Sequence, residues 1–213
     1  IEVIFNPSFP YRFVHMVLAA YLTTSLVVLA VAAYHLLRGT APEPAGIMVR
    51  MAIGFMATVA PLQILAGHEH GALVYEYQPV KLAAMEGHWE THEGNAPLVL
   101  FGWPNQQDER NDYEVKIPAV GSLVVTGSFD GTIRGLKEWP ASERPPVPWV
   151  FWTFRLMVGL GVLMLFLGWY GALRLWRGGV EQQPWFLKLC VASAPAGFVA
   201  VIAGWCTAEI GRQ

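Results

Sequence analysis

The chain has 213 residues, of which 54% are hydrophobic and only 14% charged, and its formal net charge is −2 at pH 7. This composition is typical of an integral membrane protein, and the charge gives no indication of nucleic-acid binding. The two cysteines, Cys190 and Cys206, would lie about 24 Å apart along one helix, and this distance excludes a disulfide between them.

Four apolar runs are long enough to cross a bilayer as helices, which takes about 20 mostly apolar residues. They cover residues 11–37 and 47–66, within the segment 1–66, and residues 149–176 and 185–210, within the segment 149–213. Pro61 predicts a kink in the second run, and the fourth run contains Pro195. The sequence therefore predicts an all-α integral membrane protein, a multi-span helical bundle.

The segment 67–148 separates the two pairs of runs and is too polar to lie in lipid. It contains twelve acidic and six basic residues, with turn signals such as Asp130-Gly131. Residues 79–93 are predicted to form one amphipathic helix, with Pro79 in its first turn. The apolar stretch 113–126 is broken by a proline and a glycine, and its structure is left open. We interpret the whole segment as a hydrophilic loop domain.

Basic residues in the short loops predict the orientation of the chain. Arginines and a lysine occur in the loops 38–50 and 174–188, which lie on the same side of the membrane because two spans separate them. The positive-inside rule assigns this side to the cytoplasm. The loop domain 67–148 is therefore predicted to be extracytoplasmic.

This topology brings several ligand-type side chains to the outer leaflet. His15 lies near the start of the first run, Met157 near the start of the third, and Glu209 at the end of the fourth. Imidazole and thioether groups are axial ligands that haem iron accepts, and arginines bind carboxylates such as haem propionates. Three arginines share this leaflet, namely Arg12, Arg155 and Arg212. Together they predict a haem site near the extracytoplasmic surface.

Each of these residues also has an ordinary structural interpretation. A helix-entry histidine such as His15 is often interfacial, Met157 could simply pack, and Glu209 could pair with Arg212. His88 and His92 have the i, i+4 spacing of a metal site, but the residues between them do not fit a zinc-protease motif. For this pair a solvated helix face is the preferred interpretation. His68 and His70 are interpreted as loop histidines.

Five separated motifs resemble subunit I of cytochrome bd quinol oxidase, and they follow the family's order over essentially the whole chain. They are Asn6-Pro7 with Phe13-Val14-His15, Lys81-Leu82-Ala83-Ala84-Met85-Glu86, Gly135-Leu136-Lys137-Glu138, Phe154-Arg155-Leu156-Met157-Val158, and Gly204-Trp205 through Ala208-Glu209-Ile210-Gly211-Arg212-Gln213. The resemblance implies an enzyme, a quinol:oxygen oxidoreductase that reduces dioxygen to water with a low-spin haem b, a high-spin haem b and haem d.

The resemblance also implies roles for individual residues. His15 and Met157 correspond to the axial ligands of the low-spin haem b, and Glu209 to the ligand of the high-spin haem b. Lys81 and Glu86 correspond to quinol-binding residues, with Glu86 as the proton acceptor. The implied haem neighbours are Arg155, Trp205 and Arg212.

Further expectations concern partners and location. The resemblance implies a multi-pass protein of the bacterial cytoplasmic membrane that uses ubiquinol or menaquinol, with a second oxidase subunit and small single-span subunits as candidate partners. The family's chain begins with further helices, which carry a haem d ligand. The sequence is therefore expected to be part of a longer protein, with an incomplete oxygen-reducing site on its own.

Two other functions remain open from the residues alone. One is a haem b membrane anchor that passes quinol electrons onward without oxygen chemistry. The other is a non-redox transporter or receptor, which would explain the spans and the loop domain but not why three candidate iron ligands share a leaflet. A visible spectrum distinguishes them, since they predict haem b alone and no haem, respectively.

Overall fold

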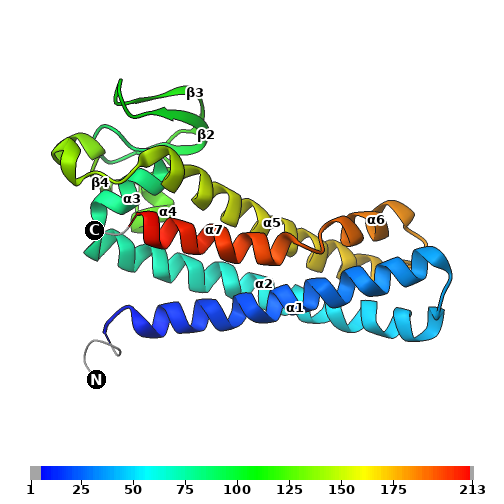
Figure 1. Cartoon of the computed structure of the whole chain (residues 1–213). Coiled ribbons are helices and arrows are strands. Elements are labelled where there is room, and N and C mark those ends of the chain that lie inside the picture. The colour runs from blue at the N-terminus through cyan, green and yellow to red at the C-terminus, as the bar shows by residue number, and fades with distance from the viewer. Residues whose placement is uncertain (1–5, 212–213) are drawn as a thin grey trace. The chain divides into compact units, whose positions relative to one another are not determined.

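Helices form most of the computed structural model, which describes residues 6–211. The helices are α1 (Phe9–Arg38), α2 (Pro42–Tyr77), α3 (Pro79–Glu86), α4 (Val120–Thr126), α5 (Val147–Trp176), α6 (Pro184–Ala192) and α7 (Ala196–Ile210), with 3-10 turns η1 (Leu136–Glu138) and η2 (Ala141–Glu143) (Figure 1). The strands are β1 (His92–Glu93), β2 (Leu98–Asn105), β3 (Arg110–Ile117) and β4 (Thr132–Ile133). The predicted helical class is confirmed, with two small sheets added to it.

Among the described residues, α1, α2 and α5 are each long and apolar enough to cross a membrane. Helices α6 and α7 pass the same test together, as one span bent by 42° at a short break. The break covers residues 193–195 and ends at Pro195, which has no N–H and disfavours helical geometry in the residue before it. Pro61, by contrast, lies inside α2 without ending it. The predicted multi-span architecture is confirmed.

The chain divides into two compact units, each with its own hydrophobic core. The first unit comprises residues 1–67 and 158–201, and the second comprises residues 68–157 and 202–213. The divisions fall inside α2, α5 and α7, so each of these three helices contributes residues to both units.

Close helix packing characterises the first unit. Helix α1 packs against α6, and large side chains that are fully buried in this core include Leu26, Ile53 and Phe186. Gly168 lets α5 approach α2 closely, because a Cβ at this position would lie 2.8 Å from the backbone nitrogen of Ala57. Small residues at helix contacts are characteristic of membrane proteins, where packing rather than water exclusion holds helices together.

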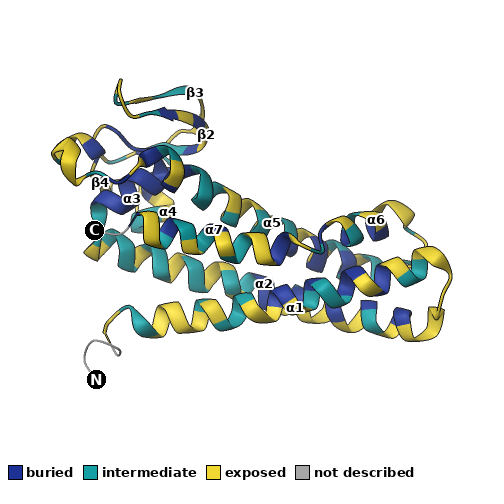
Figure 2. Ribbon diagram, in the orientation of Figure 1, coloured by how far each residue is buried: buried dark blue, intermediate teal, exposed yellow. Residues whose placement is uncertain are grey.

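Helix α3 forms the centre of the second unit, and every residue from Val80 to Glu86 is buried (Figure 2). Its core partners include Trp89, Leu136 and Val150. Strands β2 and β3 pair as an antiparallel hairpin, and the short strands β1 and β4 also pair antiparallel. The stretch 113–126, whose structure the sequence left open, contributes the end of β3 and the helix α4.

The helix predicted over residues 79–93 is wrong beyond Glu86. Gly87 ends it with a left-handed conformation, φ 73°, and a Cβ there would lie 2.9 Å from the Phe151 ring. The solvated helix face predicted for His88 is also wrong, because this side chain is buried outside any helix. His68 and His70, predicted in a loop, lie in the last turns of α2.

Candidate functional site

A buried ion pair joins α3 to the beginning of α5 in the second unit. Glu86, the last residue of α3, is only 6% exposed. Its carboxylate Oε2 lies 3.2 Å from Nη2 of Arg155. Breaking such a pair leaves an uncompensated buried charge, which costs about 3–5 kcal/mol. The sequence motifs single out both residues but do not predict the ion pair between them.

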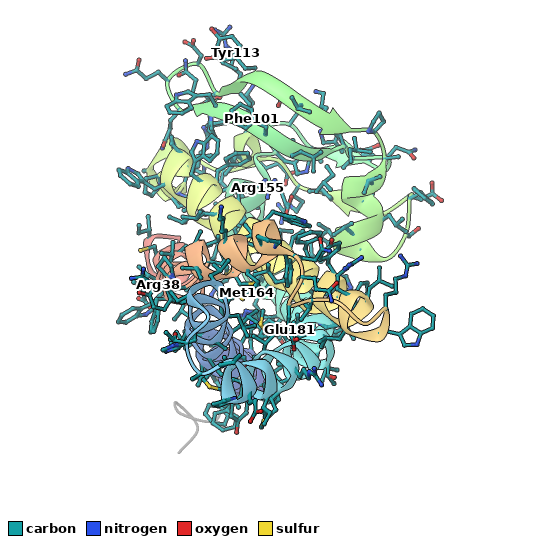
Figure 3. All side chains as sticks on the ribbon, turned by 90° about the vertical axis from the view of Figure 1, so that its right-hand side faces the viewer. Arg38, Phe101, Tyr113, Arg155, Met164 and Glu181 are labelled. Carbon is teal, nitrogen blue, oxygen red and sulfur yellow. The ribbon has the colours of Figure 1, made fainter. Side chains whose placement is uncertain are left out.

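Arg155 is held by more than the carboxylate. Its Nη2 donates to the carbonyl oxygen of Val99 on β2 at 2.6 Å, and its guanidinium lies 4.7 Å from the centre of the Phe151 ring. Phe101, on the same strand, lies between Arg155 and the hairpin residue Tyr113 in Figure 3. The Nε atom of Arg155 is buried and has no hydrogen-bond partner among residues 6–211. The arginine therefore retains a donor for an anionic or carbonyl oxygen.

Lys81 makes its contact on a different side of α3. Successive helical residues turn by about 100°, so Lys81 and Glu86 point in directions about 140° apart. Lys81, which is 6% exposed, donates from Nζ to the carbonyl oxygen of Ala208 at 3.0 Å. A cation is favourable at the C-terminal end of a helix, here that of α7. The structure therefore connects Glu86 to α5 and Lys81 to the residue before Glu209.

The two candidate iron ligands each pack against a glycine of their own unit. A Cβ at Gly67 would lie 3.2 Å from Cε1 of His15 in the first unit, and a Cβ at Gly204 would lie 2.6 Å from the sulfur of Met157 in the second. The side-chain nitrogen of Gln63 lies 3.1 Å from Nε2 of His15, a contact that the sequence gave no reason to expect. Because His15 and Met157 belong to different units, their pairing stays a prediction.

The other predicted cofactor neighbours lie at the end of α7. Trp205 is 70% exposed, and Glu209 is also exposed on this helix. An exposed indole on an apolar helix is available to lipid, another subunit or a cofactor. Arg212 lies outside the described residues.

His88 is a buried residue of the second unit that sequence reasoning did not place in the site. It is 3% exposed, and its ring centre lies 5.3 Å from that of His92. Burial, followed by electrostatic interaction with His92 and Arg155, lowers the pKa of His88 to about 4. Gly87 was the available signal, since glycine commonly ends helices in this way and turns the following side chain away from the helix face.

The motif Gly135-Leu136-Lys137-Glu138 holds the segment that contains His88. The backbone nitrogens of Leu136 and Lys137 donate to the carbonyl oxygens of His88 and Trp89 at 2.9 and 3.0 Å. Gly135 lies so close that a Cβ there would be 2.2 Å from the carbonyl carbon of Glu90. This motif therefore fixes the chain that follows α3.

An open cavity of about 690 Å³ lies elsewhere in the second unit. Its lining includes Tyr77, Val80, Trp139 and Arg144, but neither Lys81 nor Glu86. The candidate site is therefore identified from the charged side chains of Lys81, Glu86 and Arg155, and not from this cavity.

Comparisons with known proteins agree with these observations. The sequence profile of cytochrome bd terminal oxidase subunit I matches residues 1–213. Cytochrome bd-II ubiquinol oxidase subunit 1 of Escherichia coli (strain K12) is 30% identical, over 100% of this chain and 54% of the relative. Cytochrome bd ubiquinol oxidase subunit 1 of Bacillus subtilis (strain 168) is 31% identical, over 98% of this chain and 46% of the relative.

A solved structure shows the same fold. The bd oxidase from Geobacillus thermodenitrificans matches with a TM-score of 0.88 and 33% sequence identity, covering 100% of this chain and 49% of that chain. The chain thus spans about half the length of the relatives that it matches. It belongs to the cytochrome bd terminal oxidase subunit I family.

Proposed function

We propose that this chain is part of a haem-containing oxidase subunit that oxidises a membrane quinol at the extracytoplasmic side and passes its electrons through haem b toward the reduction of oxygen to water. The observation that carries the proposal is the buried pair of Glu86 and Arg155. Family membership supports it, and so do the ubiquinol oxidases among the relatives.

The quinol site is built on α3. Oxidation of a quinol releases two protons with its two electrons, so the site needs a base within hydrogen-bond reach. The Glu86 carboxylate serves as this base, and Arg155 holds it in place at 3.2 Å. Lys81, buried on another side of α3, supports the quinol oxygens only if its ammonium leaves the Ala208 carbonyl. A ubiquinol or a menaquinol fits these requirements.

The ligand chemistry of these residues suits a haem b. The imidazole of His15 and the thioether of Met157 are the ligand types of a six-coordinate, electron-transferring haem. The buried Nε of Arg155, which has no hydrogen-bond partner among the described residues, suits a propionate. The haem, when bound, supplies a one-electron acceptor. Binding through Nε2 of His15 requires the Gln63 amide to turn away.

Further parts of the proposal follow the family. Glu209 would hold the high-spin haem b, with Trp205 and Arg212 beside the haems, while haem d and dioxygen chemistry need chain outside these residues. The partners are a second oxidase subunit and small single-span subunits in a bacterial cytoplasmic membrane. The loop domain 67–148 would face the extracytoplasmic side, as the basic loops indicate.

Replacement of either residue that would hold the haem iron should abolish the low-spin haem b signal. We expect this loss for His15→Ala and for Met157→Leu, measured in reduced-minus-oxidised visible spectra of the complete oxidase. The matched controls His35→Ala and Met164→Leu should keep the signal, since Met164 is a buried packing residue of the same helix. A normal spectrum in both ligand variants would remove His15 and Met157 from the proposal.

Loss of the Glu86 carboxylate should slow quinol oxidation. An amide keeps the shape of the side chain but cannot accept a proton, so Glu86→Gln should lower kcat by about 10²-fold with the haem content unchanged. Steady-state oxidation of a short-chain quinol measures this effect. Glu93→Gln, an exposed carboxylate of β1, is the control, and equal rates for the two variants would contradict the assignment.

A visible spectrum of the complete oxidase, together with an assay of haem reduction by added quinol, tests the function as a whole. The proposal expects haem b together with the red-shifted band of haem d, and reduction of haem b by added quinol. Haem b alone would support the electron-transfer anchor instead, and the absence of haem would support the transporter or receptor.

A further inference from the structure

The proposed function leaves His88 without a role, although its environment is unusual. The side chain is 3% exposed, and its Nε2 atom has no hydrogen-bond partner among the described residues. Buried polar atoms are nearly always hydrogen-bonded, so each exception needs an explanation. A ligand that supplies the missing partner is one such explanation.

The imidazole lies among the charged groups of the candidate site. Four titratable or charged side chains act on it electrostatically, and they come from β1, β3 and α5, namely His92, Glu114, Lys116 and Arg155. Asn111 fixes the position of the adjacent backbone, because its amide donates to the carbonyl oxygen of Gly87 at 2.8 Å and to Glu114 at 2.7 Å. His88 is thus two residues from Glu86 and within electrostatic range of the arginine that holds Glu86.

This environment keeps the imidazole neutral. The pKa of His88 is lowered to about 4, first by burial and then by electrostatic interaction with His92 and Arg155, so the ring carries no charge at pH 7. A neutral imidazole has one nitrogen with a free lone pair and can accept a proton from a ligand. A base of low pKa also releases that proton readily.

We propose that His88 is a second proton acceptor for quinol oxidation, and that His92 carries the proton onward to water. This inference rests on the proposed function. When both O–H bonds of the quinol break, one proton would pass to the Glu86 carboxylate and the other to Nε2 of His88. A bound haem would accept the two electrons one at a time, and a quinone would remain. The ring of His92 lies 5.3 Å from that of His88, and its side chain is partly exposed.

The test uses the complete oxidase and steady-state oxidation of a short-chain quinol. In His88→Gln the amide can still accept a hydrogen bond but not a proton, so kcat should fall about tenfold or more while KM changes less than about threefold. In His88→Ala, added imidazole should restore the rate, and the rescue should grow with pH as more of the imidazole becomes neutral. His35→Gln, in the last turn of α1 and in the first unit, is the matched control and should leave the rate unchanged.

Two further results distinguish a failure of this inference from a failure of the proposed function. An unchanged kcat in His88→Gln, or the absence of imidazole rescue in a fully haem-loaded His88→Ala, would overturn the inference and leave the proposed function intact. If the unaltered oxidase does not reduce haem b with quinol, the proposed function itself fails. If His88→Gln lowers the haem content, His92→Gln is used as the test instead. The proposed route requires kcat to fall in His92→Gln as well, and an unchanged kcat in that variant overturns the inference.

Discussion

Replacing Gly135 by alanine is expected to destabilise the second unit by about 3 kcal/mol or more. The added Cβ would lie 2.2 Å from the carbonyl carbon of Glu90 and 2.5 Å from the carbonyl oxygen of Trp89. These are backbone atoms, which cannot turn away as a flexible side chain can, so the two segments must separate. Their separation breaks the hydrogen bonds from Leu136 to His88 and from Lys137 to Trp89.

Thermal unfolding of the detergent-solubilised complex measures this effect, with the yield of assembled oxidase as a second readout. Gly71→Ala is the matched control, because a Cβ at Gly71 meets no atom within 4 Å and alanine favours the helix. A melting temperature for Gly135→Ala equal to that of the control would show that the close backbone approach at this motif does not limit stability.

The second large effect is expected for Arg155→Met. The substitution removes the cation that faces the buried Glu86 carboxylate and the donor to the Val99 carbonyl. A buried charge left without its partner costs about 3–5 kcal/mol. Arg155→Lys should lose less, since it keeps the charge but replaces the planar guanidinium, whose Nη2 contacts both the Glu86 carboxylate and the Val99 carbonyl, by a flexible ammonium.

A double variant distinguishes this ion pair from a general packing defect. When Glu86 is changed to Gln as well, no unpaired charge remains at this site, so Arg155→Met with Glu86→Gln should be more stable than Arg155→Met alone. Thermal unfolding of the four proteins in the cycle measures the coupling. Strictly additive losses would mean that the pair contributes no interaction energy.

The sequence predicted the membrane helices well because a long apolar run is a local signal. The runs that led to the multi-span prediction lie within α1, α2, α5 and the bent pair α6 and α7, although α2 continues to Tyr77, beyond the predicted run 47–66. The β2–β3 hairpin was not predicted, since Gly102 and Pro104 interrupt the alternation of apolar and polar residues that would indicate a strand. The register of the pair is irregular at this place.

The candidate site was harder to predict because its contacts join distant parts of the chain. Glu86 and Arg155 were each singled out from motifs, but their ion pair depends on how α3 packs on α5, which no local pattern encodes. His88 was assigned to an exposed face because the helix was extended past Gly87. Once the helix ends at that glycine, the same side chain turns into the core.

The bend at residues 193–195 gives the two halves of the fourth span different axes. Helix α6 packs against α1. Near the end of α7, the carbonyl oxygen of Ala208 accepts a hydrogen bond from Lys81. Because the helix is interrupted there, a rotation of α6 about its axis does not force an equal rotation of α7, as it would in one continuous straight helix. Substitutions that repack α6 can therefore accumulate over evolution without changing the orientation of Trp205 and Glu209 on α7.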